Sequence, residues 1–267
     1  MVNTETRVKN SARNIIFSMI AYILQIVLGF VVRRYFIFHF GTEYLGLSSL
    51  FANILSLLSL AELGFGTAIV FAMYKPMADG NTEKVRELLQ FYKRCYFVIG
   101  GVILAIGLCV LPFMNFFETK VPDIEINLYL VYLIYLFNSV ISYFFAHRRS
   151  LLYTSQRSDI ESKVNMSLNL VSTLLQLLII LFLQNFYLYI LVSGVISIVN
   201  NIVVCFITKK MYAEYLVKPK SYLDAESRKS INKNIRAMIF HKIGSAVVYS
   251  TDSLIIYLML GSTVLGK

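Results

Sequence analysis

Charged side chains are scarce in this sequence. They make up 15% of the 267 residues, whereas an ordinary soluble domain has about 25%. Hydrophobic residues reach 57%, and the mean hydropathy is +0.67. With so little charge, most of any surface would be apolar, which excludes an ordinary soluble domain and favours a membrane protein.

Cysteine and histidine are also rare, with three residues each. Cys95, Cys109 and Cys205 lie within or beside apolar segments, without the spacing of a zinc site or a disulfide framework. The sequence also lacks a nucleophile–base arrangement, a Walker-type phosphate loop and a dinucleotide-binding turn. We therefore expect no metal, no organic cofactor and no enzymatic activity, while coupling to H+ or Na+ stays open. Tryptophan is absent, so the 18 tyrosines are expected to supply the aromatic belts at the membrane interfaces.

Acidic residues are outnumbered by basic ones, 15 against 25, which gives a net charge of +10. A nucleic-acid-binding protein carries such an excess as a basic patch on a soluble fold. Here the basic residues stand between long apolar runs. We therefore expect membrane lipids, and not nucleic acid, as partners.

Long apolar runs are what the sequence has in abundance. A bilayer core of about 30 Å requires about 20 apolar residues in a helix. The runs predict an all-α polytopic membrane protein with about seven transmembrane helices. The expected helices are 14–38, 44–73, 94–118, 125–148, 164–183, 187–208 and 241–260.

The stretch from Val164 to Thr208 has no charged residue and is too long for one crossing. As a single helix it would extend about 67 Å, more than twice the thickness of the bilayer core. Gln184 and Asn185 are the most polar residues near its middle. We therefore expect the chain to fold back at these two residues.

The distribution of lysine and arginine predicts the orientation in the membrane. With a cytoplasmic N-terminus, the segments 1–13, 74–94, 147–163 and 209–242 lie inside and contain 21 of the 25 basic residues. The positive-inside rule therefore predicts that the N-terminus is cytoplasmic. Within these segments we expect a helix cap at Asn81 or Thr82 and another helix start near Asp224.

A short pattern, G-[ST]-x-x-L-G, occurs at Gly41–Gly46 and again at Gly261–Gly266, each time after an apolar run. The second copy follows six predicted helices and the longest cytoplasmic segment. Parallel six-helix repeats are an arrangement used by secondary transporters. We therefore expect a cytoplasmic N-terminus (1–13), a six-helix lobe (14–208), an amphipathic inter-lobe link (209–240) and the first helix of an incomplete second lobe (241–267).

Three further features accompany the repeat: Arg33 and Arg34 in the first helix, AELGFGTA at 61–68, and TDSLIIYLMLG at 251–261. On these residues the chain resembles the bacterial polysaccharide flippases of the multidrug/oligosaccharidyl-lipid/polysaccharide exporter superfamily, in their first lobe and the first helix of their second. The resemblance implies translocation of an undecaprenyl-diphosphate-linked oligosaccharide across the bacterial inner membrane by alternating access, for surface polysaccharide biosynthesis. It implies a lipid-linked oligosaccharide as substrate, and a second lobe or a second copy as partner.

Ionisable residues at membrane depth are the candidates for the substrate cavity, because a charge there costs about 2.5–3.5 kcal/mol on insertion scales. Arg33 and Arg34 precede a further apolar run, and a guanidinium fork suits a diphosphate; outward snorkelling is the alternative. Glu62 is expected either to pair with an arginine, a coupling cation or a proton, or to have a structural role. Asp252 lies deep in the seventh helix, and the resemblance implies that it faces the other lobe.

Two cytoplasmic features each have two interpretations. Arg148 and Arg149, at the end of the fourth helix, either only follow the positive-inside rule or contact a lipid headgroup. The link at 209–240 either lies flat on the cytoplasmic leaflet or is a solvated linker.

Small and amide side chains within the predicted helices are expected at helix contacts. The glycines are Gly64 and Gly66, and the asparagines include Asn165, Asn200 and Asn201.

Three other functions compete with a polysaccharide flippase. A multidrug exporter of the same superfamily would favour acidic cavity residues over Arg33 and Arg34. A membrane enzyme of the same pathway would be expected to have a large outside loop, and the predicted outside loops are short. A truncated, non-functional half-transporter is the third.

Overall fold

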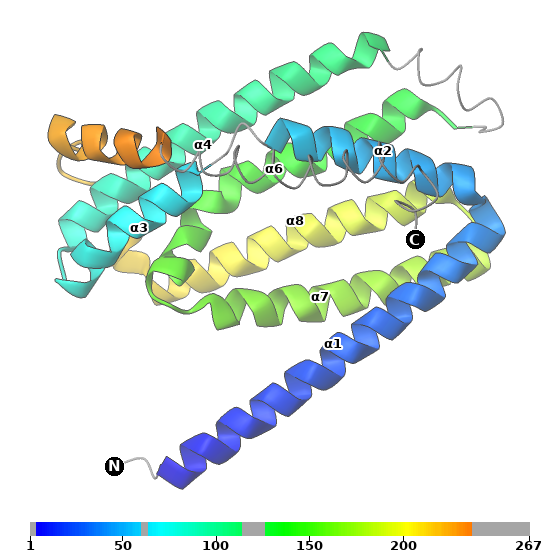
Figure 1. Ribbon diagram of the computed structural model, residues 1–267, viewed down its shortest axis with the longest axis horizontal. Coiled ribbons are helices and arrows are strands. Elements are labelled where there is room, and N and C mark those ends of the chain that lie inside the picture. The colour runs from blue at the N-terminus through cyan, green and yellow to red at the C-terminus, as the bar shows by residue number, and fades with distance from the viewer. Residues whose placement is uncertain (1–3, 60–63, 114–125, 237–267) are drawn as a thin grey trace, which may run out of the picture.

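The chain folds into a bundle of long helices (Figure 1). The computed structural model describes residues 4–59, 64–113 and 126–236, and every regular element within these ranges is helical. The prediction of an all-α polytopic fold is therefore confirmed. The long helices are α1 (Thr4–Phe40), α2 (Thr42–Ser59), α3 (Phe65–Ala78), α4 (Thr82–Val110), α6 (Leu128–Thr154), α7 (Ser158–Leu178) and α8 (Phe186–Met211).

Shorter elements connect or extend these helices. A π-helical turn prolongs α7. The last helix among the described residues, 225–236, begins directly after Asp224, where a helix start was predicted. The Asp224 carboxylate caps this helix by accepting a hydrogen bond of 2.8 Å from the backbone N–H of Ser227. The π-helical turn is η3 (Ile179–Leu183), and the other short elements are η2 (Leu111–Phe113) and η4 (Ala213–Leu216).

Within the described residues, five helices are long and apolar enough to cross a membrane. They are Tyr22–Phe40, Thr82–Val110, Leu128–Thr154, Ser158–Leu183 and Phe186–Met211. The predicted second crossing, 44–73, falls on α2 and α3, and residues 60–63 between them lie outside the described residues. The predicted seventh helix, 241–260, also lies outside them, so it stays a prediction.

The boundaries of α4 differ from the predicted ones. The third crossing was predicted to begin at Arg94, after a helix cap at Asn81 or Thr82, but α4 runs without interruption from Thr82 to Val110. Its N-cap is Asn81, whose Oδ1 accepts a hydrogen bond of 3.0 Å from the backbone N–H of Lys84. Because no proline or glycine interrupts 82–99, the helical hydrogen bonds continue across the change from polar to apolar sequence.

The chain folds back at Gln184 and Asn185, as predicted. Gln184 adopts the left-handed conformation, with φ 46° and ψ 38°, and ends the helical run. Asn185 then caps α8, because its Oδ1 accepts a hydrogen bond of 3.1 Å from the backbone N–H of Leu188. Two polar residues that terminate one helix and start the next explain how an uncharged run makes two crossings.

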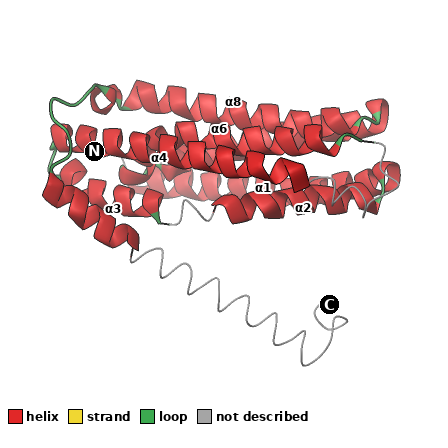
Figure 2. Ribbon diagram, turned by 90° about the horizontal axis from the view of Figure 1, so that it is seen from above, coloured by secondary structure: helices red, strands yellow, loops and turns green. Residues whose placement is uncertain are grey.

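The helix turns gather at two opposite ends of the bundle (Figure 2). At one end, the rings of Phe40 and Tyr44 lie 5.8 and 4.9 Å from the ring of Phe186, which brings the α1–α2 and α7–α8 turns together. The α3–α4 and α6–α7 turns and η4 lie at the other end. There Tyr212 Oη donates a hydrogen bond of 2.5 Å to Ser155 Oγ. This second end carries the basic segments and is called the basic end below.

Helix α6 occupies the centre of the bundle and contacts α2, α3, α4, α7 and α8. Its residues Val131, Tyr132, Leu136 and Leu151 are completely buried. By contrast, α1 contacts mainly α7 and α2, and in Figure 1 its N-terminal part runs away from the bundle. Helix α1 is therefore the peripheral element of the lobe.

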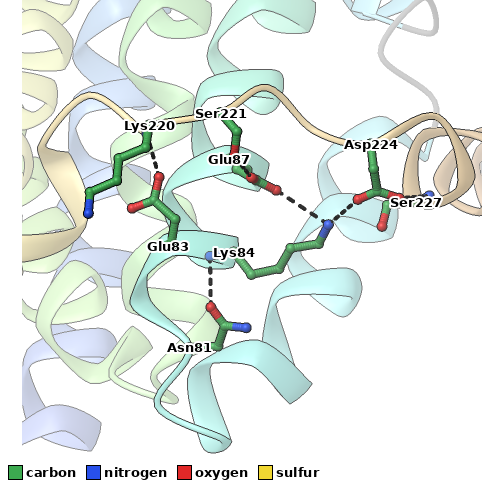
Figure 3. A network of polar contacts seen from close by, with 8 residues as sticks. All are labelled: Asn81, Glu83, Lys84, Glu87, Lys220, Ser221, Asp224 and Ser227. Atoms are coloured by element: carbon green, nitrogen blue, oxygen red, sulfur yellow. Dashed lines mark hydrogen bonds and ion pairs between the residues drawn. The ribbon is translucent and has the colours of Figure 1, made fainter.

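The segment that follows α8 is packed against the bundle. Leu223, Ile231 and Ile235 are buried, and Figure 3 shows Lys220, Ser221 and Asp224 in polar contact with the first turns of α4. The described part of the link is therefore not a solvated linker, and these three apolar residues are covered by protein. We call residues 213–236 the docked link.

Candidate functional site

The two arginines of the first helix lie on the part of α1 that the bundle leaves uncovered. Val32 and Phe36 are buried against the bundle, while Arg33 and Arg34 are both exposed. Phe36 fixes this orientation, since its ring lies 4.9 Å from the ring of Tyr189. The arginines precede the end of α1 at Phe40 by six and seven residues, or roughly 10 Å.

Arg34 points away from the bundle more directly than Arg33. Successive residues of an α-helix are about 100° apart, so Arg34 lies about 180° from the mean direction of Val32 and Phe36, and Arg33 about 80° from it. Phe30 and Phe38, four residues before and after Arg34, are 71% and 81% exposed. Arg34 therefore lies in the middle of the uncovered apolar stripe of α1.

Neither arginine is neutralised by the described part of the lobe. Within residues 4–59, 64–113 and 126–236, no carboxylate forms an ion pair with Arg33 or Arg34. Two guanidinium groups on an apolar helix face are thus available to an anion from outside the described part of the lobe.

The other two cavity candidates, Glu62 and Asp252, lie outside the described residues. Gly64 and Gly66, near Glu62, are among the described residues. A Cβ on Gly66 would lie 2.5 Å from Tyr96 Oη, and Gly64 has φ 83°, which favours glycine. Gly66 therefore serves close packing, as predicted, and Gly64 serves the start of α3.

Arg149 belongs to a buried polar cluster between three helices. Its Nη1 lies 3.3 Å from Glu161 Oε1 on α7, and its Nη2 donates a hydrogen bond to Asn201 Oδ1 on α8. Glu161 and Asn201 are only 5% and 2% exposed. The cluster therefore joins α6, α7 and α8 by one ion pair and one charge-assisted hydrogen bond.

A second amide contact lies close to this cluster in the sequence. Asn200 Nδ2 donates a hydrogen bond of 2.5 Å to Asn165 Oδ1. The predicted helix-contact role of Asn165, Asn200 and Asn201 is thereby confirmed. Glu161 was not predicted, because only the lysines and arginines of the segment 147–163 entered the prediction of the orientation.

Arg148, one residue earlier, lies in a different environment. It lines a cavity of about 310 Å³ together with Arg86, Lys93, His147 and Lys218. The apolar part of the lining comes from Leu89, Tyr215, Leu216 and Val217, and Gln90 completes it. We call this cavity the basic pocket.

The basic pocket is formed by three parts of the chain. Arg86 and Lys93 belong to α4, Arg148 to α6, and Lys218 to the docked link. The Arg86 guanidinium is held by Glu83, at 3.1 Å, and by the backbone C=O of Glu214, at 2.7 Å. Arg148 Nη1 donates to Cys205 Sγ at 2.6 Å. The sequence offered Arg148 as a headgroup contact but gave no reason to group it with the other three cations.

Together, the five long apolar helices, the basic end and the intramembrane arginines define a multi-pass α-helical membrane protein. Residues 11–267 match the family model described as polysaccharide biosynthesis protein, so the chain belongs to that family. No curated protein and no solved structure matches the chain. Membership supports a role in polysaccharide biosynthesis or export, and members of the family are generally transporters rather than enzymes.

Proposed function

We propose that the protein translocates a lipid-linked oligosaccharide, carried on a polyprenyl diphosphate such as undecaprenyl diphosphate, across the bacterial cytoplasmic membrane. The sugar would then enter surface polysaccharide. The transport step makes and breaks no covalent bond, and it would proceed by alternating access between this lobe and a second lobe or a second copy. The membership of the chain in a polysaccharide biosynthesis family supports the proposal.

The observation that carries the proposal is the pair of exposed arginines on α1. The diphosphate of such a substrate is its most charged group and the most difficult to move through an apolar medium. Arg33 and Arg34 lack an acidic partner among the described residues. Each guanidinium can donate two parallel hydrogen bonds to phosphate oxygens, so the pair would neutralise the diphosphate inside the membrane.

Arg34 is the better placed of the two for this role. It points away from the bundle, toward the side on which a second lobe would close a cavity, whereas Arg33 points sideways along the surface of the lobe. Glu62 and Asp252 stay candidates for the same cavity, and coupling to H+ or Na+ stays part of the proposal.

The test replaces both arginines in the whole gene product, in cells that depend on it for their surface polysaccharide. We expect Arg33→Ala/Arg34→Ala to lower surface polysaccharide by about tenfold or more, because each lost charge-assisted hydrogen bond contributes about 1.5–3 kcal/mol. The lipid-linked precursor should accumulate at the same time. Arg34→Ala alone should have the larger effect of the two single variants.

The matched control is Lys209→Ala/Lys210→Ala, which removes two adjacent exposed cations at the end of α8. This variant should keep its surface polysaccharide. If the arginine double variant is present in the membrane at normal levels and also keeps it, the arginines do not bind the diphosphate.

A further inference from the structure

The basic pocket lies where three apolar runs of the bundle end. On α4 the uncharged run begins after Arg94, on α6 it ends before His147, and on α8 it ends before Lys209. The pocket residues Lys93 and Arg148 stand beside two of these boundaries. This is the depth at which the phosphate groups of membrane lipids lie.

The charge in the pocket is not balanced by the described part of the protein. Among the described residues, Lys93, Arg148 and Lys218 form no ion pair, and no carboxylate lines the cavity. Arg86 is the one lining cation with an acidic partner in the described part of the chain, Glu83. The Lys93 ammonium lies 5.8 Å from the centre of the Phe97 ring, which does not neutralise its charge. Three cations that line one small space repel one another, and an anion between them would remove that repulsion.

The walls of the pocket are already formed without a ligand. Leu89 and His147 are buried in its floor, and Arg86 and Arg148 are held by the contacts described above. Its volume of about 310 Å³ is at the lower end of the about 300–1,000 Å³ of small-molecule sites. A preformed cavity of this size holds a phosphate and the small group esterified to it.

We propose that the basic pocket binds the phosphate of an anionic phospholipid headgroup from the cytoplasmic leaflet. Arg148 would contact the phosphate oxygens, together with Lys93 and Lys218, which are both exposed. The apolar side chains of Leu216 and Val217 lie beside them at the rim, where the glycerol and the first acyl carbons would follow. Basic pockets between membrane helices on the cytoplasmic side recognise lipid headgroups in this way.

A bound phosphate would also join separate parts of the lobe. Lys218 belongs to the docked link, whereas Lys93 and Arg148 belong to α4 and α6. An anion between them therefore holds the link against the bundle. This site is independent of the proposed transport of oligosaccharide, since a lipid is bound here and not moved.

The test measures lipid binding to the whole gene product in neutral detergent by native mass spectrometry. The probes are phosphatidylglycerol, which is anionic, and phosphatidylcholine, which carries the same phosphate next to a cation. We expect the first phosphatidylglycerol to bind at least tenfold more tightly. Lys93→Gln/Lys218→Gln should weaken this binding by about thirtyfold, which corresponds to two surface cations.

Four further measurements complete the test. Lys209→Gln/Lys210→Gln removes the same charge from the same end of the bundle and should change binding less than twofold. Lys218→Arg should keep the affinity, and Arg148→Gln should lower it. Inorganic phosphate should compete for the pocket only weakly, because it lacks the glycerol and acyl contacts at the rim.

Three results would overturn the proposal. Equal loss in the pocket variant and in the α8 control would mean that only total charge matters. Equal binding of the two lipids would mean that the pocket does not select an anionic headgroup. Inorganic phosphate that binds as tightly as the lipid would identify a free anion as the ligand.

Discussion

At the scale of single residues, Arg148 and Arg149 show how one position along a helix decides the role of a charge. The two side chains point about 100° apart. Arg149 therefore meets Glu161 and Asn201 between the helices, while Arg148 reaches the basic pocket. The sequence analysis placed both arginines at the basic end of the same helix. The periodicity of a single helix does not reveal which neighbouring helices each side chain meets.

The pair of Arg149 and Glu161 leads to a prediction about stability. Glu161→Ala leaves the Arg149 guanidinium without its carboxylate between packed helices, and removing one member of a buried pair costs on the order of 3 kcal/mol. We expect a lower midpoint of thermal unfolding. In a background with Cys95 and Cys109 replaced by Ser, the reaction of the buried thiol of Cys205 with a fluorescent maleimide reports that midpoint, since the thiol becomes accessible on unfolding.

The control for this prediction is Glu226→Ala, which removes an exposed carboxylate and should change the stability by less than about 0.5 kcal/mol. Arg149→Met/Glu161→Leu should recover most of the loss, because an apolar pair of similar volume replaces the ion pair. If Glu161→Ala unfolds at the same temperature as Glu226→Ala, the pair does not stabilise the bundle.

At the scale of elements, the contact between α4 and the docked link is the feature that sequence patterns did not reveal. Three residues in the first turns of α4 contact the link (Figure 3). Glu83 contacts Lys220, Lys84 contacts Asp224, and Glu87 contacts Ser221. These residues are more than 130 positions apart in the chain. The sequence predicted a helix start near Asp224, but only the structure shows that the link packs against the first turns of α4.

The docked link should respond to pH in a defined way. The Lys84 ammonium, with the backbone N–H of Ser227, holds the pKa of the Asp224 carboxyl well below its ordinary value of 3.8. The charged carboxylate therefore favours the docked link at all pH values above 3.8, and this contribution is lost as the pH falls below 3.8 toward the lowered pKa. Hydrogen exchange of the amides of 225–236, corrected for intrinsic rates, should show constant protection between pH 7 and pH 5 and a decrease in strong acid.

Lys84→Ala should lower the protection of the same amides at neutral pH, because it removes the cation that holds Asp224. Lys163→Ala serves as control, since it removes a lysine from an exposed pair with Asp159 elsewhere on the bundle. Unchanged protection of 225–236 in Lys84→Ala would show that the buried Leu223, Ile231 and Ile235 hold the link without this contact.

At the scale of the whole molecule, the apolar runs and the turn at Gln184 and Asn185 were predictable, because the bilayer thickness limits the length of each crossing. The roles of the tyrosines could not be predicted. Tyr92, Tyr96, Tyr132 and Tyr143 are buried between helices instead of forming an interfacial belt. Aromatic side chains suit both the interface and helix contacts, and only the arrangement of the helices distinguishes the two.

The orientation of the bundle can be tested at its two ends. Thr42 lies at the end that carries the α1–α2 and α7–α8 turns, and Ala78 lies at the basic end; both are exposed. In a cysteine-free background, a membrane-impermeant maleimide should label Thr42→Cys in intact cells and Ala78→Cys only after permeabilisation. The reverse pattern would contradict a cytoplasmic basic end.

The proposed transport moves a lipid-linked oligosaccharide from one leaflet to the other. The most direct measurement follows the leaflet position of a fluorescent polyprenyl-diphosphate oligosaccharide in vesicles that contain the whole gene product. We predict rapid exchange of the substrate between leaflets with the wild type, and the background rate with Arg33→Ala/Arg34→Ala and in protein-free vesicles. A wild-type exchange rate equal to that of protein-free vesicles would contradict the proposed transport.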